Sequence, residues 1–193
     1  MKIALVTCRE LKSDFGDVYD AFPKPLTRLL HQHGYYVLAL PNFPDEILEV
    51  LALLSPSLIV LAGGEDLGFN EDRDITENLI LDYAINNTNV KVFGICRGLQ
   101  LMVTRFGGSI TPTKNHIGVL HNIAGSGYNG KVNSFHKFRI ESLTSDFSIL
   151  ATAEDGSVEA IKHRTLPWVG WMWHPERMNM PPWMLLAFEN IIK

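Results

Sequence analysis

The sequence predicts an α/β protein with a mostly parallel sheet, covered by helices on both faces and extended by antiparallel strands. The first half of the chain alternates short apolar runs with amphipathic helical patterns, as parallel strands joined by helices require. These runs are apolar at consecutive positions, which is typical of strands buried on both faces. The second half changes to shorter β-like runs, which predicts the antiparallel extension. No long linker separates the halves, so we expect one domain over residues 1–193.

The first half follows a regular order of elements. Leu26, Leu29 and Leu30 share one face of the first predicted helix, and Gly34 is placed to end it. Pro44 is well placed at the start of the second helix. In chain order we predict a strand at 2–8, a helix at 20–33, a strand at 35–40, a helix at 45–54, a strand at 57–62, a helix at 74–86, a strand at 90–95 and a helical pattern from 99 to 106.

The second half is predicted to contain mainly short strands. The final helix, 183–192, follows two prolines that favour a helix start. The β-like runs lie at 131–133, 138–140, 148–152, 158–161 and 169–173.

Composition excludes several classes of function. The chain has 193 residues and a net charge of -4 without a basic cluster, so no nucleic acid partner is expected. No apolar run approaches the ~18 to 20 residues of a membrane span, so no membrane role is expected. The apolar start of the chain lacks a signal-peptide core and is interpreted as a strand. Cys8 and Cys96 are the two cysteines, which favours a reducing, cytoplasmic setting over a disulfide scaffold.

A small-x-Cys-x-small pentapeptide, Gly94-Ile95-Cys96-Arg97-Gly98, lies between a predicted strand and a predicted helix. Glycines on either side of one residue allow a tight, strained turn of the kind that presents a nucleophile. The N-terminus of the following helix would favour a thiolate and could hold an oxyanion. Taken alone, the pentapeptide is equally compatible with a buried structural cysteine.

A second motif, Trp173-His174-Pro175-Glu176-Arg177, favours the catalytic interpretation of Cys96. A cysteine nucleophile needs a base to accept the thiol proton and a third group to orient that base. His174 could be the base, and Glu176, two residues on across a proline, could hold one imidazole tautomer. We therefore predict Cys96, His174 and Glu176 as catalytic residues.

With these residues in place, the chain resembles the class I glutamine amidotransferase-like family, which has a flavodoxin-like fold, and within it the stand-alone γ-glutamyl hydrolases. Four blocks carry the resemblance, in the order that the family has them. They are Ala62-Gly63-Gly64-Glu65-Asp66-Leu67, Gly94-Ile95-Cys96-Arg97-Gly98-Leu99-Gln100, Val132-Asn133-Ser134-Phe135-His136 and Trp173-His174-Pro175-Glu176.

The resemblance implies hydrolysis of a γ-glutamyl amide, a small-molecule substrate, through a glutamyl thioester on Cys96. The backbone N–H groups of Gly64 and Arg97 would bind the oxyanion. No metal and no cofactor is expected. Substrate-binding candidates are Gly63, Gln100, Ser134, Phe135 and His136.

The segment after the Gly-Gly loop, Arg73-Asp74-Ile75-Thr76-Glu77, also recurs in γ-glutamyl hydrolases. Asp74 is predicted to cap a helix, with Glu77 completing a capping box. Arg73 is predicted to be solvated, with contact to a substrate carboxylate as the alternative.

Several segments are most similar to a narrower group that hydrolyses γ-glutamyl-CDP-amidate on the route to phosphoramidate decoration of bacterial capsules. They are Asn115-His116-Ile117-Gly118, Asn133-Ser134-Phe135-His136, Val158-Glu159-Ala160-Ile161-Lys162-His163 and Met172-Trp173-His174-Pro175-Glu176-Arg177. Lys114, His116 and Arg177 then become candidates for contacting a phosphate of the leaving group.

Three alternatives remain open from the sequence. The loop between Gly64 and Arg73 has eight residues, which is short for a hydrolase of γ-glutamyl-γ-aminobutyrate but does not remove that substrate from consideration. The same three catalytic residues would serve a glutaminase subunit that supplies ammonia to a synthetase partner. A redox or ligand-binding module would need a reactive Cys96 but not the His174–Glu176 pair.

Overall fold

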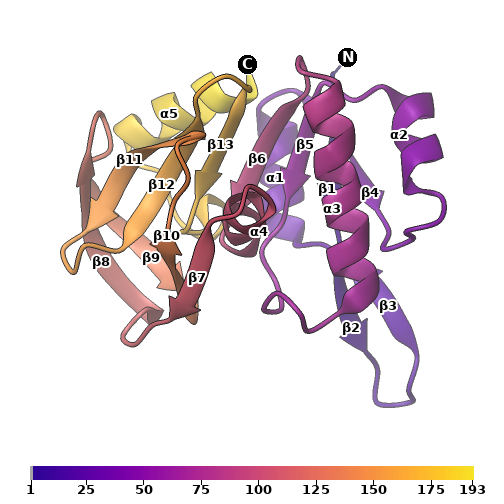
Figure 1. Ribbon diagram of the computed structural model, residues 1–193, viewed down its shortest axis with the longest axis horizontal. Helices are drawn as coiled ribbons and strands as arrows, with labels where there is room; N and C mark the ends of the chain where they lie inside the picture. Colours follow the sequence, from indigo (N-terminus) through magenta and orange to yellow (C-terminus); the bar gives the residue numbers. More distant parts are fainter. Residues whose placement is uncertain (1) are drawn as a thin grey trace.

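The computed structural model describes residues 2–193, and its core is a sheet of nine strands in the order β4-β1-β5-β6-β13-β12-β11-β8-β9 (Figure 1). The strands from β4 to β13 in this order are parallel, and those beyond β13 pair antiparallel. The predicted parallel sheet with an antiparallel extension is confirmed. The strands of this sheet are β1 (Lys2–Thr7), β4 (Tyr35–Leu40), β5 (Leu58–Leu61), β6 (Lys91–Ile95), β8 (Ile117–Gly125), β9 (Gly130–Phe135), β11 (Phe147–Ala153), β12 (Val158–His163) and β13 (Trp168–Trp171).

Helices cover both faces of the parallel strands. Successive residues of a strand point to opposite faces, so Val60 packs with α1 and α5 while Ile59 packs with α2, α3 and α4. Both faces are therefore buried, which explains the continuous apolar runs of the sequence. The helices are α1 (Lys24–Gln32), α2 (Ile47–Leu54), α3 (Glu71–Asn86), α4 (Arg97–Arg105) and α5 (Pro182–Ile192), with a single 3₁₀ turn at Pro175–Arg177.

Two pairs of short strands lie outside the main sheet, and of these four strands only the one at 138–140 was predicted. β2 (Arg9–Lys12) pairs with β3 (Val18–Ala21), and β7 (Ser109–Pro112) pairs with β10 (Phe138–Ser142). The β3 strand occupies the first residues of the helix predicted over 20–33. That helix begins at Lys24 because Pro23 and Pro25 bracket its first residue, and proline is tolerated only in the first turn. No helix within residues 2–193 has the length and apolar character that crossing a bilayer demands.

Helix α4 lies unusually close to the sheet, because glycines remove the side chains that would separate them. A Cβ atom added at Gly98 would lie 2.2 Å from the carbonyl oxygen of Leu61 on β5. A Cβ at Gly94 would lie 2.8 Å from the backbone of Gly98, and one at Gly170 would meet Leu99 at the same distance. The turn between β6 and α4 is thus pressed directly onto its neighbouring strands.

We expect Gly98→Ala to destabilise the protein, although alanine favours a helix by up to about 1 kcal/mol over glycine. The new methyl group would meet a backbone carbonyl that cannot rotate away, so a net loss of about 1 to 3 kcal/mol is expected. Urea unfolding would measure it.

The matched control is Gly34→Ala, at a glycine with φ of 85° and open space around it. Only the left-handed backbone then opposes alanine, and a loss of about 1 kcal/mol is expected. If Gly98→Ala proved as stable as the unmodified protein, the tight contact between α4 and β5 would be disproved.

Candidate active site

Cys96 occupies the strained turn between β6 and α4. Its φ of 52° and ψ of -103° are uncommon for a residue with a side chain and cost roughly 1 to 3 kcal/mol. The surrounding backbone holds this conformation. The Cys96 N–H donates to the Trp171 carbonyl at 2.7 Å, and the Cys96 carbonyl accepts from the Gln100 N–H at 3.1 Å. The geometry is that of the nucleophile elbow predicted from the glycine spacing.

His174 leaves the same edge of the sheet as Cys96. Strands β6 and β13 are parallel neighbours, and Ile95 pairs with Trp171, so the residues that follow each strand emerge side by side. His174 Nδ1 lies 2.7 Å from Glu176 Oε1. A carboxylate only accepts, so Nδ1 carries the proton and Nε2 keeps its lone pair when the ring is neutral. The predicted His174–Glu176 pair is present, with both side chains buried.

Asn133 fixes the backbone of His174, a role that the sequence did not reveal. Its Nδ2 donates to the His174 carbonyl, and its Oδ1 accepts from the His174 N–H, both at 2.8 Å. The amide therefore pairs with His174 as a neighbouring strand would. The visible signal in the sequence is a polar residue beside Val132, inside a strand that is otherwise buried at this point.

The Gly63-Gly64 loop follows β5 and packs between two side chains. A Cβ on Gly63 would lie 2.6 Å from His174 Cε1, and one on Gly64 would lie 2.2 Å from Arg73 Nη1. Glycine is thus required at both positions by the neighbours of the loop, irrespective of any substrate. Arg73 also donates to the Ala62 carbonyl at 2.8 Å and to the Gly63 carbonyl at 3.4 Å, which holds the loop in place.

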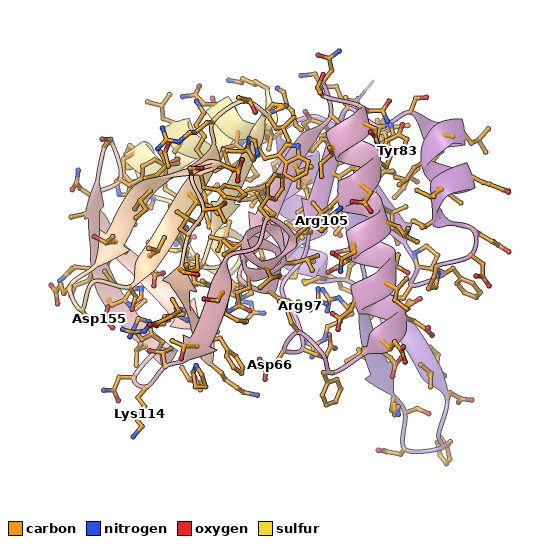
Figure 2. The ribbon with its side chains drawn as sticks, viewed as in Figure 1. Asp66, Tyr83, Arg97, Arg105, Lys114 and Asp155 are labelled. Atoms are coloured by element: carbon orange, nitrogen blue, oxygen red, sulfur yellow. The ribbon has the colours of Figure 1, made fainter. Side chains whose placement is uncertain are left out.

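A buried network of charges supports both candidate oxyanion donors, Gly64 and Arg97. Glu77 is fully buried on α3 and binds two arginines, Arg73 through Oε1 at 3.1 Å and Arg97 through Oε2. Arg97 also pairs with Asp74, and Arg73 with Glu65 (Figure 2 shows Arg97 between α4 and α3). The guanidinium of Arg97 is thus held by two carboxylates, so its backbone N–H is the group that Arg97 can offer to an oxyanion at the Cys96 turn.

This network corrects three predictions. Arg73 is not solvated but completely buried, because it is surrounded by the Gly-Gly loop and two carboxylates. Asp74 is not the helix cap. The helix cap is Asn70, whose side-chain oxygen accepts a hydrogen bond from the Arg73 N–H at 2.8 Å. The Asp74 carboxylate instead accepts from the Gly68 N–H and pairs with Arg97. Glu77 makes no capping box, since its two carboxylate oxygens accept hydrogen bonds from Arg73 and Arg97.

Burial dominates the protonation of the Cys96 thiol. It raises the pKa to about 12, although the Arg97 N–H and the positive charge of Arg177 act in the opposite direction. Glu176 and Glu159 add to the rise. The helix terminus therefore has the predicted effect, but burial outweighs it, and the resting thiol is protonated. Burial also acts to raise the pKa of Glu65, yet Arg73 and Arg9 hold it below its usual range.

Among the predicted substrate-binding residues, Phe135 lies against His174, whereas Gln100 and His136 share a backbone partner. The ring of Phe135 packs edge-on against His174 at 5.8 Å, and the Arg177 guanidinium lies 4.9 Å from the same ring. Gln100 is buried and donates to the Phe138 carbonyl at 3.0 Å. His136 Nδ1 donates to that same carbonyl at 2.9 Å, so one backbone oxygen joins the two predicted residues.

The remaining candidates differ in accessibility. Lys114 is exposed on the loop between β7 and β8 and points away from the body of the protein (Figure 2). Ser134 is fully buried, and its hydroxyl donates to the His116 carbonyl at 2.7 Å. His116 is buried too, with one ring nitrogen facing Asp155 and the other facing His136. Contact of these residues with a substrate stays a prediction.

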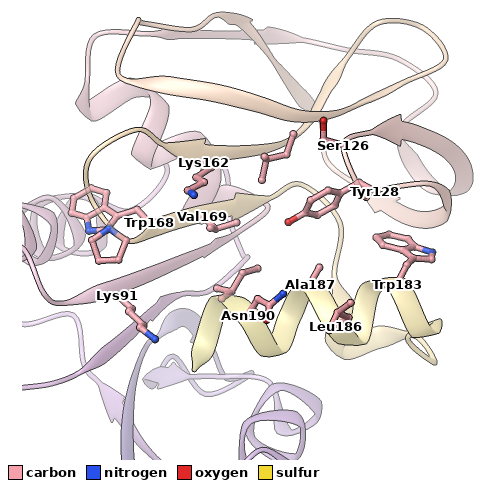
Figure 3. A pocket seen from close by; sticks show the side chains of 14 residues that line it. Lys91, Ser126, Tyr128, Lys162, Trp168, Val169, Trp183, Leu186, Ala187 and Asn190 are labelled. Atoms are coloured by element: carbon pink, nitrogen blue, oxygen red, sulfur yellow. The ribbon is translucent and has the colours of Figure 1, made fainter.

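A cavity of about 470 Å³ lies away from this site, under α5 (Figure 3). Lys91 and Trp168 line it, and they begin β6 and β13, whereas Cys96 and His174 follow the opposite ends of these strands. The cavity is therefore separate from the candidate active site.

The strand order, the strained turn at Cys96 and the His174–Glu176 pair at the same edge of the sheet are the features of an α/β protein with a candidate site after its parallel strands. A profile of the family described as glutamine amidotransferase class-I matches residues 15–193. The chain belongs to the class I glutamine amidotransferase family.

Similar proteins include members with different reactions. The γ-glutamyl-CDP-amidate hydrolase of Campylobacter jejuni is 37% identical over 63% of this chain and 62% of its own length. One subunit of the glutamine-hydrolysing GMP synthase of Pyrococcus abyssi is 30% identical over 77% of this chain and 80% of its own length. The match to a solved structure of a Thermoplasma acidophilum protein covers 100% of this chain and 93% of that chain, with a TM-score of 0.76 at 20% identity, which supports the fold.

The chain spans less than two thirds of several curated relatives. It covers 62% of the Campylobacter protein and 31% of a GMP synthase from Thermosipho melanesiensis.

We expect Glu77→Gln to destabilise the protein by about 3 to 5 kcal/mol, because it leaves two buried arginines short of one negative charge. Urea unfolding would measure the loss. Asp82→Asn is the matched control, since the Arg105–Asp82 pair is exposed and should contribute less than about 1 kcal/mol. Equal losses from the two variants would contradict a central role of the buried network.

We also expect Cys96 to show no thiolate at neutral pH. A thiol with a raised pKa keeps its proton at pH values well below that pKa. The ultraviolet absorbance of a Cys96 thiolate, identified by comparison with Cys96→Ala, should therefore not develop between about pH 6 and 9. Cys8→Ala serves as the control, because burial raises the pKa of Cys8 to about 11. A thiolate band near pH 7 that disappears only in Cys96→Ala would contradict the expectation.

Proposed function

We propose that this protein is a hydrolase that cleaves a γ-glutamyl amide with Cys96 as nucleophile. The observation that carries the proposal is the strained Cys96 turn beside His174, whose Nδ1 lies 2.7 Å from Glu176. A structural cysteine would need neither the strained backbone nor a histidine oriented by a carboxylate.

The reaction begins when His174 Nε2 accepts the thiol proton as Cys96 Sγ attacks the γ-carbonyl carbon. The tetrahedral intermediate collapses to a glutamyl thioester, and His174 returns the proton to the departing amine. Water, activated by the same nitrogen, then attacks the thioester and releases glutamate and the free thiol. The high pKa of Cys96 fits this sequence, because proton transfer accompanies attack and no resting thiolate is needed.

Backbone donors stabilise the negative oxygen of the intermediate. The N–H groups of Gly64 and Arg97 belong to two loops that Arg73, Glu77 and Arg97 hold together. Such donors are effective because they are fixed before the reaction, and each contributes roughly 3 kcal/mol.

For the leaving group we propose CDP-amidate, and hence a role in phosphoramidate decoration of a capsule or surface polysaccharide from within the cytoplasm. The similarity to the Campylobacter hydrolase supports this choice. Arg177 offers an exposed guanidinium beside Phe135 and His174, suited to a phosphate. Lys114 is exposed and forms no side-chain hydrogen bond or ion pair within residues 2–193, so it is available for the same role. The buried His116 is not part of this proposal.

A glutaminase subunit that supplies ammonia to a synthetase is the second candidate. The specific support is the relation to the GMP synthase subunit of Pyrococcus abyssi over 80% of its length. The same three residues would act on glutamine, with ammonia as the leaving amine. The isolated chain would then be slow on every substrate until a synthetase is added.

We expect Cys96→Ala to lower glutamate release by roughly 10⁴-fold or more, because no other group forms the thioester. His174→Ala should be nearly as damaging, and Glu176→Gln should cost less, about 10² to 10⁴-fold, since it disturbs only the orientation of the imidazole. Glutamate released from γ-glutamyl-CDP-amidate by the purified variants measures these effects. Cys8→Ala is the control and should remain active, because Cys8 follows β1, which β5 separates from the strand that leads to Cys96. Substantial activity in Cys96→Ala would exclude this mechanism.

The same assay distinguishes the substrates. Rapid hydrolysis of γ-glutamyl-CDP-amidate by the isolated chain, with little from γ-glutamyl-γ-aminobutyrate or glutamine, is the expected result. Cleavage of γ-glutamyl-γ-aminobutyrate alone would overturn the choice of leaving group while leaving the mechanism in place.

A further inference from the structure

Three histidines surround a fully buried carboxylate on the antiparallel side of the sheet. The carboxylate is Glu159 of β12. His136 Nε2 lies 3.4 Å from its Oε1, His121 Nε2 lies 3.4 Å from its Oε2, and His116 Nδ1 lies 3.8 Å from Oε1. One donor atom each from His116, His121 and Glu159 lies within 4.8 Å of the others. The group comes from three segments of the chain, at β8, after β9 and on β12, that only folding brings together.

Hydrogen bonds outside this group fix the protons of two of the rings. His116 Nε2 lies 2.9 Å from Asp155 Oδ2, and His136 Nδ1 lies 2.9 Å from the Phe138 carbonyl. Carboxylate and carbonyl oxygens only accept, so both of these nitrogens carry protons. Asp155 is itself held by the N–H and the hydroxyl of Ser157, each at 2.9 Å. In neutral rings the opposite nitrogens, His116 Nδ1 and His136 Nε2, therefore present lone pairs.

These two lone pairs face each other at 3.1 Å and also face the Glu159 carboxylate. Such an arrangement is repulsive unless a cation lies among the atoms. The hydroxyl of Ser134 does not relieve it, because that hydroxyl donates to the His116 carbonyl. Within residues 2–193, neither Glu159 oxygen nor His121 Nε2 has a hydrogen-bond partner. A single extra proton would satisfy one pair of atoms, whereas a metal ion would satisfy all of them together.

We propose that His116, His121, His136 and Glu159 bind a divalent transition-metal ion of the Zn²⁺ type. Imidazole nitrogens with one carboxylate are a donor set suited to such ions. Bonds of about 2.0 to 2.1 Å at tetrahedral angles place ligand atoms about 3.3 Å apart. The three imidazole nitrogens lie 3.4 to 3.8 Å from the nearer Glu159 oxygen, those of His116 and His136 lie 3.1 Å apart, and the donor atoms of His116, His121 and Glu159 lie within 4.8 Å of one another, so small side-chain shifts would bring them onto one ion. Asp155 and the Phe138 carbonyl orient two of the rings in the way that outer partners of metal-binding histidines do.

The site is structural in character. Glu159, His116 and His136 are buried, and four protein ligands fill a tetrahedral ion completely, which leaves no position for a substrate. The ion would join β8, β12 and the ends of β9. These strands lie beyond β13 in the sheet, and their cross-link would steady the Phe138 carbonyl that Gln100 also binds. The inference goes beyond the proposed reaction and does not depend on it.

The test is Zn²⁺ binding by the full chain, without an affinity tag, after removal of metals with a chelator. We expect close to one equivalent of tightly bound Zn²⁺ by elemental analysis after gel filtration, and a rise in the midpoint of thermal unfolding. Glu159→Gln and His121→Ala should each abolish tight binding. Asp155→Asn should weaken it by about 10 to 100-fold, because it removes only an outer partner of His116.

His31→Ala is the control for adventitious binding, since His31 is an exposed histidine on α1. It should bind Zn²⁺ like the unmodified protein. Circular dichroism identifies any variant that fails to fold, and the partly exposed Asp155 provides a substitution that leaves the core intact. Absence of tight binding in the unmodified protein, or equal binding in Asp155→Asn and His121→Ala, would overturn the proposal. Because the readouts are metal content and stability, failure here is distinct from failure of the proposed reaction.

Discussion

The position of Glu77 between Arg73 and Arg97 is the constraint on which the candidate active site depends. All three side chains are withdrawn from water, and separating charges of this kind from solvent is costly unless every one is paired. The pairing fixes α3 against the start of α4 and against the loop that follows β5. The elbow, the Gly-Gly loop and the backbone of Arg97 therefore cannot shift independently. Any other arrangement of these segments would leave a buried charge of Arg73, Glu77 or Arg97 without its partner, at a high cost in desolvation free energy.

Strain and burial act together on Cys96. The backbone of β13 holds its unusual dihedral angles, and the apolar surroundings keep its thiol neutral. A neutral thiol is a poor nucleophile and a poor target for oxidants, so its reactivity depends on a base that is already oriented. Asn133 and Glu176 provide that orientation, one through the backbone of His174 and the other through its ring. In the proposed reaction, the thiol therefore loses its proton only when a substrate is in place.

The parallel half of the sheet, the strained turn at Cys96 and the His174–Glu176 contact could be predicted from the sequence because local patterns encode them. Val60 and Ile59 are both apolar because each faces a helical layer, and the spacing of the glycines around Cys96 marks the tight turn between a strand and a helix. Arg73 and Glu159 could not be placed, because a charged residue gives no local sign that it is buried. Arg73 is enclosed by the loop that follows β5, and Glu159 is met by histidines from β8 and from the end of β9. The β7–β10 pairing joins strands far apart in the chain, so no turn motif in the sequence could predict it.

The position of β13 in the sheet has a consequence for synthesis of the chain. It lies between β6 and β12, yet it is made after every antiparallel strand. As the ribosome releases the chain, the parallel strands can assemble first, with β6 as an open edge and Cys96 without the carbonyl of Trp171. Insertion of β13 closes that edge and delivers His174 in the same step. The turn at Cys96 and the His174–Glu176 pair therefore come together only when the middle of the sheet is filled.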